Sequence, residues 1–435
     1  SPWFDKKFTQ EHHFDSVAEG SFFQGSELLH YQVFRETGDS LGFPLYLIHI
    51  PGKLDRTEVY CYPDEAEQWI AFQHAFLHWI KGSGIYPDLI HCHDHHVGLL
   101  PFFMQNCLAF RDFNSVKTVF TVHNGQYQGR MNWNKAIFMP AFDTWKWGLM
   151  DWDGQVNPLA TAIKCCDAYT TVSEGYLQEL YVENTGLASL FSDEAAKSHG
   201  IVNGIDSDYW NPEKDALIPV NYSPKTVDIG KRKNKEAFCT LYGLSTAIPL
   251  LAYIGRFATE KGADLLADII VKLFSNSDNK ISIFILGSGD ANIQASLSVL
   301  LEKYSGRLAV FFGYDEILAH QVYAAADMLL MPSRVEPCGL NQLYALKYGT
   351  VPIVRGIGGL KDTVIDVEEN GYGYVFKEAA VADAVAAVER ALPAIGSAKS
   401  LSVIRAHEMS LDYSWNKSAQ KYIALYNQLV KSYGT

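Results

Sequence analysis

Short apolar segments recur along the second half of the chain, and each ends in a polar turn followed by a stretch with helical spacing of apolar residues. These segments lie at 249–257, 280–289, 308–315, 328–331 and 351–355, with a weaker one at 372–376. Apolar runs separated by helical patterns are typical of βα units, whose strands lie parallel in one sheet. The second half therefore predicts an α/β domain with a doubly wound parallel sheet.

The first half shows the same alternation less regularly. Its first convincing buried strand is 41–50, and a helical pattern follows at 64–82. Strand, turn and helix units then occupy 87–104, 116–129 and 167–180. Between 199 and 215 the pattern breaks into Asn-Gly and Asn-Pro turns, which mark a domain boundary. We expect Rossmann-like domains at 1–213 and 214–413, and a C-terminal helix within 414–435 that returns to the first domain.

Composition narrows the functional classes. The 435 residues are enough for two or three domains, because single cores stop growing near about 250 to 300 residues. The formal charge of -13 argues against a nucleic-acid-binding surface, and no apolar run is long enough to predict a membrane span. The seven cysteines are odd in number and lack CxxC spacing, which is typical of reduced thiols in a cytoplasmic protein.

One carboxylate, Glu336, lies in the polar turn between the apolar run 328–331 and a helical pattern that begins near Leu340. Ligands of parallel sheets bind beyond the carboxyl ends of the strands, where helix N–H groups provide an anion site. Glu336 and the amides near Gly339 would then contact one ligand. A solvated glutamate beside a Pro-Cys-Gly turn explains this segment equally well.

Two cations, Arg256 and Lys261, follow the strand at 249–257 and precede a helix. Such a pair can neutralise a leaving diphosphate, although two solvated surface cations are the alternative. The Gly-Gly step within 355–364 could bind phosphate through its amides, or could serve only tight helix packing. The sequence lacks a G-x-x-x-x-G-K-[ST] loop, and no G-x-G-x-x-G follows the first visible strand, so neither ATP hydrolysis nor NAD chemistry is indicated.

Four histidines and Asp94 lie within residues 91–96. Side chains alternate between the two faces of a strand, so few of these imidazoles can converge, and we expect no bound metal. Asp94, at the end of its strand, is a candidate ligand for sugar hydroxyls. His123 ends the next strand, where it is either a core histidine or a donor into the same site.

A set of ordered motifs extends along nearly the whole chain: HCHDHHVGLLP, FTVHNGQYQG, DAYTTVSEGY, GIVNGIDSDYWNP, IGRFATEKGADLL, LGSGD, SRVEPCGLNQLYALKYGTVPIVRGIGGLKDTV and SWNKSAQKYIALY. Together they resemble the bacterial glycogen synthase and plant starch synthase family of retaining glucosyltransferases. The resemblance implies the GT-B fold, in which two Rossmann-like domains face a deep cleft.

The resemblance also implies roles for individual residues. Glu336 would bind the donor glucose, Arg256 and Lys261 would neutralise the diphosphate, and Asp94 and His123 would contact the sugar. The substrate-binding positions that it implies are Asn203, Tyr314, Cys338, Gly339, Leu340 and Asn341, with Tyr314 stacked on the adenine.

The implied reaction is transfer of glucose from ADP-glucose to the 4-hydroxyl of an α-1,4-glucan with retention, without a metal or other cofactor. UDP-glucose as donor and a binding-only pseudoenzyme of the same fold remain alternatives, while glucan phosphorylase would need a pyridoxal-phosphate lysine for which no segment is evident. No nucleic-acid or membrane partner is expected.

Four features depart from the family pattern. No K-x-G-G-L loop precedes Phe14, so a first βα unit is expected to be absent from this chain. Asn341 and Ile357 stand where the family usually has threonine, and Glu260 stands where it usually has glutamine. Because backbone amides survive the first two changes, we expect phosphate binding to persist. The carboxylate of Glu260 is expected to point outward.

Overall fold

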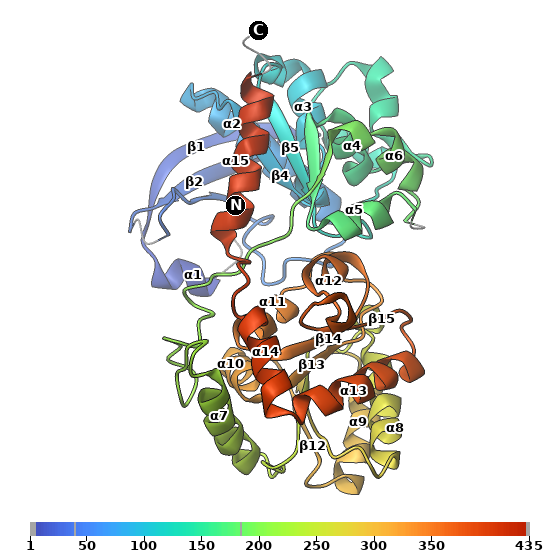
Figure 1. The fold of residues 1–435 in the computed structure, drawn as a ribbon. Coiled ribbons are helices and arrows are strands. Elements are labelled where there is room, and N and C mark those ends of the chain that lie inside the picture. Colours follow the sequence, from blue (N-terminus) through green and yellow to red (C-terminus); the bar gives the residue numbers. More distant parts are fainter. Residues whose placement is uncertain (1–5, 39–40, 183–184, 432–435) are drawn as a thin grey trace. The chain divides into compact units, whose positions relative to one another are not determined.

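The structure is a computed structural model that describes residues 6–38, 41–182 and 185–431, and it divides into two compact units (Figure 1). Unit 1 comprises 1–171, 180–199 and 424–435, and unit 2 comprises 172–179 and 200–423. None of the helices within the described ranges is both long and apolar enough to cross a membrane.

Unit 1 contains two main sheets. Its helices are α1 (Lys6–Glu11), α2 (Glu65–Ser83), α3 (Leu100–Asn106), α4 (Pro158–Cys165) and α6 (Ala188–Asp193). Its strands are β1 (Phe14–Gln24), β2 (Glu27–Glu36), β3 (Tyr46–His49), β4 (Leu89–His93), β5 (Lys117–Val122), β6 (Asp151–Trp152), β7 (Gln155–Val156), β8 (Ala168–Thr171) and, at its boundary, β9 (Ser198–Gly200). The order β4-β5-β8-β9 makes one sheet, in which β4, β5 and β8 are parallel as predicted. The antiparallel sheet β1-β2-β3 was not predicted, although β3 lies within the expected strand 41–50.

Unit 2 is built on a six-stranded parallel sheet. Its strands are β10 (Leu250–Ile254), β11 (Ser282–Gly287), β12 (Leu308–Phe312), β13 (Met328–Met331), β14 (Val351–Arg355) and β15 (Tyr374–Phe376). Its helices are α5 (Glu174–Leu180), α7 (Val227–Leu241), α8 (Leu266–Ser275), α9 (Ala291–Lys303), α10 (Glu316–Ala325), α11 (Asn341–Lys347), α12 (Gly358–Thr363), α13 (Val381–Ile395) and α14 (Ala398–Glu408). Each apolar segment identified in the second half of the sequence is a strand of this sheet, which is buried on both faces by apolar clusters.

The strand order of unit 2 is β12-β11-β10-β13-β14-β15, with all neighbouring strands parallel. The chain starts in the middle with β10, builds outward to β12, and then returns to place β13 on the other side of β10. Ligands of open α/β sheets bind beyond the carboxyl ends of the strands at such a reversal. The ends of β10 and β13 are therefore the expected binding edge of this unit.

The units are divided at different residues from the domains expected at 1–213 and 214–413. Residues 200–213 belong to unit 2 because Trp210 stacks on His320 and Tyr344 there. Residues 172–179 also belong to unit 2, where the N–H of Gly175 donates to Asp362 at 2.8 Å.

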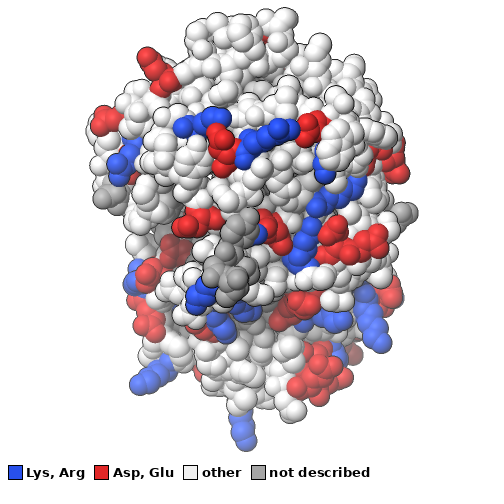
Figure 2. Space-filling view, turned by 90° about the horizontal axis from the view of Figure 1, so that it is seen from above, with Lys and Arg blue, Asp and Glu red and all other residues white. Residues whose placement is uncertain are grey.

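The last helix, α15 (Trp415–Lys431), contributes to both units. Leu425 packs with Val119 and Ala168, and the hydroxyl of Tyr426 lies 2.6 Å from Nδ1 of His91. On the face shown in Figure 2, acidic and basic side chains are interspersed and make no continuous basic field.

Candidate active site

The ends of β10 and β13 in unit 2 enclose a cavity of about 170 Å³. Its lining includes Lys261, Glu336, Leu340 and Asn341, which the sequence had singled out, together with Ser333, which it had not. The polypeptide enters α11 directly after this turn, and Leu340 and Asn341 at its start line the same cavity as Glu336. The predicted grouping of an acid, a cation and a helix start is thus present within one unit.

Glu336 is buried, with 7% of its surface exposed. Its Oε1 accepts a hydrogen bond from Nζ of Lys261 at 2.7 Å, and its Oε2 accepts one from Oγ of Ser333 at 2.9 Å. A carboxylate removed from water needs such charged and hydrogen-bonding partners. Glu336 is therefore not the solvated loop residue that was the alternative, and its orientation is fixed on both oxygens. Nothing in the sequence indicated this role for Ser333 beyond its position three residues before Glu336.

Arg256 lies in the loop after β10 and is 66% exposed on its side chain. Its guanidinium donates to Oε1 of Glu260, so the expectation that this carboxylate points outward was wrong. The main-chain carbonyl of Glu260 in turn accepts from the N–H groups of Arg334 and Val335, at 2.7 and 3.1 Å. These bonds hold Glu260 beside the loop that carries Glu336. The two cations of the predicted clamp thus each have a carboxylate partner, Glu260 for Arg256 and Glu336 for Lys261.

The turn between Glu336 and α11 depends on Gly339, whose φ of 73° lies in the left-handed region that side chains rarely adopt. Leu340 precedes the helix, and Nδ2 of Asn341 donates to the carbonyl of Ile254 at 2.7 Å, which ties α11 to the end of β10. Burial raises the pKa of the Cys338 thiol to about 12, against an opposing backbone hydrogen bond from Asn203. Asn203 and Cys338 therefore lie side by side, and Cys338 is not a thiolate.

The Gly-Gly step at 358–359 serves helix packing. A Cβ on Gly358 would lie 2.2 Å from the carbonyl oxygen of Glu336, and one on Gly359 would lie 2.1 Å from that of Cys338. The N–H of Gly358 donates to Glu179 at 2.7 Å, and the N–H of Gly359 donates to the Glu336 carbonyl at 3.0 Å. These glycines bring α12 against the Glu336 turn, as the packing alternative predicted.

Tyr314 lies in the loop between β12 and α10 and is 84% exposed. It is not among the residues that line the cavity beside Glu336. Its ring is open to solvent and can stack on a flat group such as a nucleotide base.

In unit 1, Asp94 follows β4 with φ 61° and ψ 174°, a combination that is almost restricted to glycine and costs about 1–3 kcal/mol. Its Oδ1 accepts from the N–H of His123 at 2.9 Å, and its own N–H donates to the carbonyl of Thr121 at 3.0 Å. Asp94 and His123, predicted from two separate strands, are therefore in direct contact. The strained backbone marks this position as a functional candidate.

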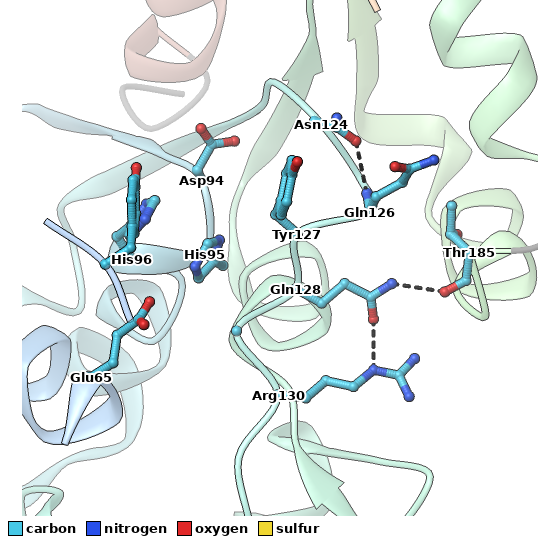
Figure 3. A pocket seen from close by; sticks show the side chains of 12 residues that line it. Glu65, Asp94, His95, His96, Asn124, Gln126, Tyr127, Gln128, Arg130 and Thr185 are labelled. Carbon is cyan, nitrogen blue, oxygen red and sulfur yellow. Dashed lines mark hydrogen bonds between the residues drawn. The ribbon is translucent and has the colours of Figure 1, made fainter. Parts of the chain in front are cut away.

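Asp94 also lines a cavity of about 930 Å³ within unit 1 (Figure 3). The other lining residues are Tyr60, Glu65, His95, His96, Asn124, Gln126, Tyr127, Gln128, Gly129, Arg130 and Thr185. Gln128 donates to the carbonyl of Thr185 at 2.8 Å and accepts from Arg130 at 3.0 Å, which fixes two of the side chains seen in Figure 3. An aromatic ring among amides, a carboxylate and a guanidinium suits a ligand with many hydroxyl groups. Our prediction named only Asp94 here, although the polar run QYQGR after His123 was a signal.

The histidines near Asp94 lie against one another in pairs, His91 with His93 and His95 with His96. Among the residues that the structure describes, no three His, Cys, Asp or Glu side chains are placed to hold a metal ion. Burial lowers the pKa of His91 to about 3 and that of His96 to about 4, so both are neutral at pH 7. Nδ1 of His93 lies 3.0 Å from Nε2 of His123, so these two rings share a hydrogen bond.

Comparison with known proteins identifies the family. A sequence model described as the starch synthase catalytic domain matches residues 1–193, and one described as glycosyl transferases group 1 matches residues 243–400. A glycogen synthase of Flavobacterium johnsoniae is 44% identical over 430 residues, which cover 99% of this chain and 91% of that protein. The chain belongs to the glycogen synthase family. A glycogen synthase of Thermodesulfovibrio yellowstonii is 36% identical over 401 residues, covering 89% of this chain and 78% of that relative.

Solved structures agree with membership of the glycogen synthase family. The catalytic domain of starch synthase IV from Arabidopsis thaliana, bound to ADP and acarbose, has a TM-score of 0.87 and 29% identity, and covers 97% of this chain and 89% of that one. Sucrose-phosphate synthase from Thermosynechococcus elongatus, at 20% identity, a TM-score of 0.59 and coverage of 89% and 84%, shares the fold alone. The chain therefore has the predicted GT-B fold and is a hexosyltransferase.

Proposed function

We propose that this glycogen synthase family member transfers glucose from ADP-glucose to the non-reducing end of an α-1,4-glucan, with retention of configuration. The observation that carries the proposal is the grouping of Lys261, Glu336 and the start of α11 at the strand-order reversal of unit 2. The structure of the Arabidopsis relative with ADP and acarbose supports this choice of donor and acceptor class.

The proposed roles in unit 2 follow from charge. Glu336 accepts hydrogen bonds from hydroxyls of the donor glucose, and the N–H groups of Leu340 and Asn341 bind the diphosphate. Negative charge grows on the diphosphate as its bond to glucose breaks, so Arg256 and Lys261 stabilise the transition state more than the bound donor. The leaving phosphate accepts the proton of the attacking hydroxyl, and we propose that no metal ion or other cofactor is needed. Tyr314 stacks on the adenine, and Asn203, Cys338 and Gly339 complete the substrate-binding set.

The proposed roles in unit 1 concern the sugar. Asp94 and the main-chain carbonyl of His123 bind the transferred sugar as positive charge develops on it, and the cavity that Asp94 lines holds glucan residues. Its acceptors and donors match sugar hydroxyls, and the exposed ring of Tyr127 can lie against a sugar face. All seven cysteines lie in the described part of the chain and are free thiols, which supports a cytoplasmic location.

The test is a donor comparison. With glycogen as acceptor, we expect release of ADP from ADP-glucose without glucose 1-phosphate, and a much lower rate with UDP-glucose. Glu336→Ala should lower kcat by about 100-fold or more while the folded protein retains glucan binding. Preference for UDP-glucose would overturn the donor assignment. Glucan binding without turnover of either donor would favour the binding-only alternative.

A further inference from the structure

Glu260 forms an ion pair with Arg256, a cation that the proposed reaction needs for the diphosphate. Glu260 is half-buried, with 23% of its side chain exposed, whereas Arg256 is largely exposed. The main chain of Glu260 is held in place, because its carbonyl accepts from the N–H groups of Arg334 and Val335. The less mobile partner of the pair is therefore the acid.

Lys261 and Arg256 differ in what a diphosphate must displace. Lys261 is bound to Glu336, a residue that itself belongs to the donor site and contributes to sugar binding. Arg256 is bound to Glu260, and both residues lie outside the lining of the cavity beside Glu336. A guanidinium binds carboxylate and phosphate oxygens through the same N–H groups. Glu260 and a diphosphate therefore compete for Arg256.

We propose that Glu260 lowers the affinity of the active site for nucleoside diphosphates by competing for Arg256, so that the product ADP leaves faster. The inference rests on the proposed function and adds a residue that sets nucleotide affinity. An exposed or partly exposed ion pair contributes about 0.2–1 kcal/mol, which corresponds to about a 1.4- to 5-fold change in the dissociation constant. The competition is electrostatic and involves charges that solvent reaches, so its effect on ADP affinity weakens as the salt concentration rises.

The decisive variant is Glu260→Gln, which keeps the side-chain length and removes the charge. We expect calorimetry to show ADP binding about 2- to 5-fold tighter than in the unchanged protein at 20 mM salt, with a smaller difference at 500 mM. Glu302→Gln is the matched control, because it removes the same charge from an exposed position on α9 and should leave ADP affinity unchanged. In an Arg256→Ala background, Glu260→Gln should have no effect.

Three results would overturn the inference. Weaker ADP binding by Glu260→Gln would show that Glu260 prepares Arg256 for the diphosphate and does not compete with it. Unchanged ADP affinity would show that the ion pair between Glu260 and Arg256 does not weaken ADP binding. If Glu260→Gln still tightened ADP binding in the Arg256→Ala background, the effect of the Glu260 charge would not depend on Arg256. If the unchanged protein turns over ADP-glucose, these failures concern Glu260 alone, whereas absence of any ADP binding would remove the proposed function as well.

Discussion

Ser333→Ala tests how firmly the carboxylate of Glu336 is held. Ser333 is 2% exposed, and its Oγ donates to Oε2 of Glu336 at 2.9 Å. Removing the hydroxyl leaves a buried, charged oxygen without that donor, while Oε1 keeps its bond to Lys261. A hydrogen bond to a charged group contributes about 1.5–3 kcal/mol, so we expect a loss of about 2 kcal/mol in the free energy of unfolding.

The assay is differential scanning calorimetry combined with steady-state kinetics. For a unit of this size, 2 kcal/mol corresponds to a fall of about 4–8 °C in Tm. We also expect kcat to fall about 10-fold, because a carboxylate with one free oxygen no longer presents a single geometry to the donor sugar. Ser333→Thr keeps the hydroxyl and is the matched control, which should recover most of both losses.

The reasoning would be refuted by a Ser333→Ala protein with unchanged Tm and unchanged kcat. A fall in Tm with unchanged kcat would show that the hydrogen bond serves the fold alone. If Ser333→Thr behaved like Ser333→Ala, the volume of the side chain and not its hydroxyl would be what matters.

The remaining predictions concern four other residues of the chain. Arg256→Ala and Lys261→Ala should each lower kcat by about 10²-fold or more and raise the donor KM less, because both cations act on charge that grows in the transition state. Initial rates at varied ADP-glucose concentration measure both constants. Unchanged kcat in both variants would contradict the assignment of these cations to the diphosphate. Asp94→Ala should lower kcat by about 10²-fold, because the N–H of His123 loses its acceptor, and the same kinetic assay would contradict the role if activity survived. His74 is buried, and its ring nitrogens have no hydrogen-bond partner among the residues that the structure describes. Burial lowers its pKa from 6.5 to about 3. Its contribution to stability is therefore present above pH 6.5 and declines as pH falls toward 3. His74→Phe should raise the free energy of unfolding by about 2 kcal/mol more at pH 5 than at pH 8, as measured by chemical unfolding. An equal effect at both pH values would contradict this reasoning.

The sequence was sufficient to predict the sheet of unit 2 because its strands are buried on both faces. Each then consists of a short apolar run, such as 282–287, that is visible without any knowledge of its neighbours. The antiparallel strands β1 and β2 escaped prediction because many of their side chains face solvent, as the mixed burial along Phe14–Gln24 shows. Their pairing depends on contacts with other segments, and the local pattern did not reveal it.

The sequence predicted where the candidate site residues lie in the fold, but not which residues they contact. Strand ends and turns located Glu336, Lys261 and Asp94, because chemistry in parallel sheets gathers at the carboxyl edge. The partners were not predictable. The bond of Lys261 to Glu336 depends on how two loops fold against each other, and the bonds of Glu336 to Ser333 and of Arg256 to Glu260 depend on the turn that each loop adopts. Most of the lining of the unit 1 cavity was missed for the same reason.

The contribution of α15 to unit 1 has a consequence for synthesis on the ribosome. Tyr426 contacts His91 across 335 residues of sequence, and Leu425 packs with Val119 and Ala168. At about 5–20 residues per second, about 20 to 70 s separate the emergence of these two parts of one core. The sheet of unit 1 is therefore synthesised before the helix that packs on it, and the apolar patch at Val119 and Ala168 stays uncovered for that interval.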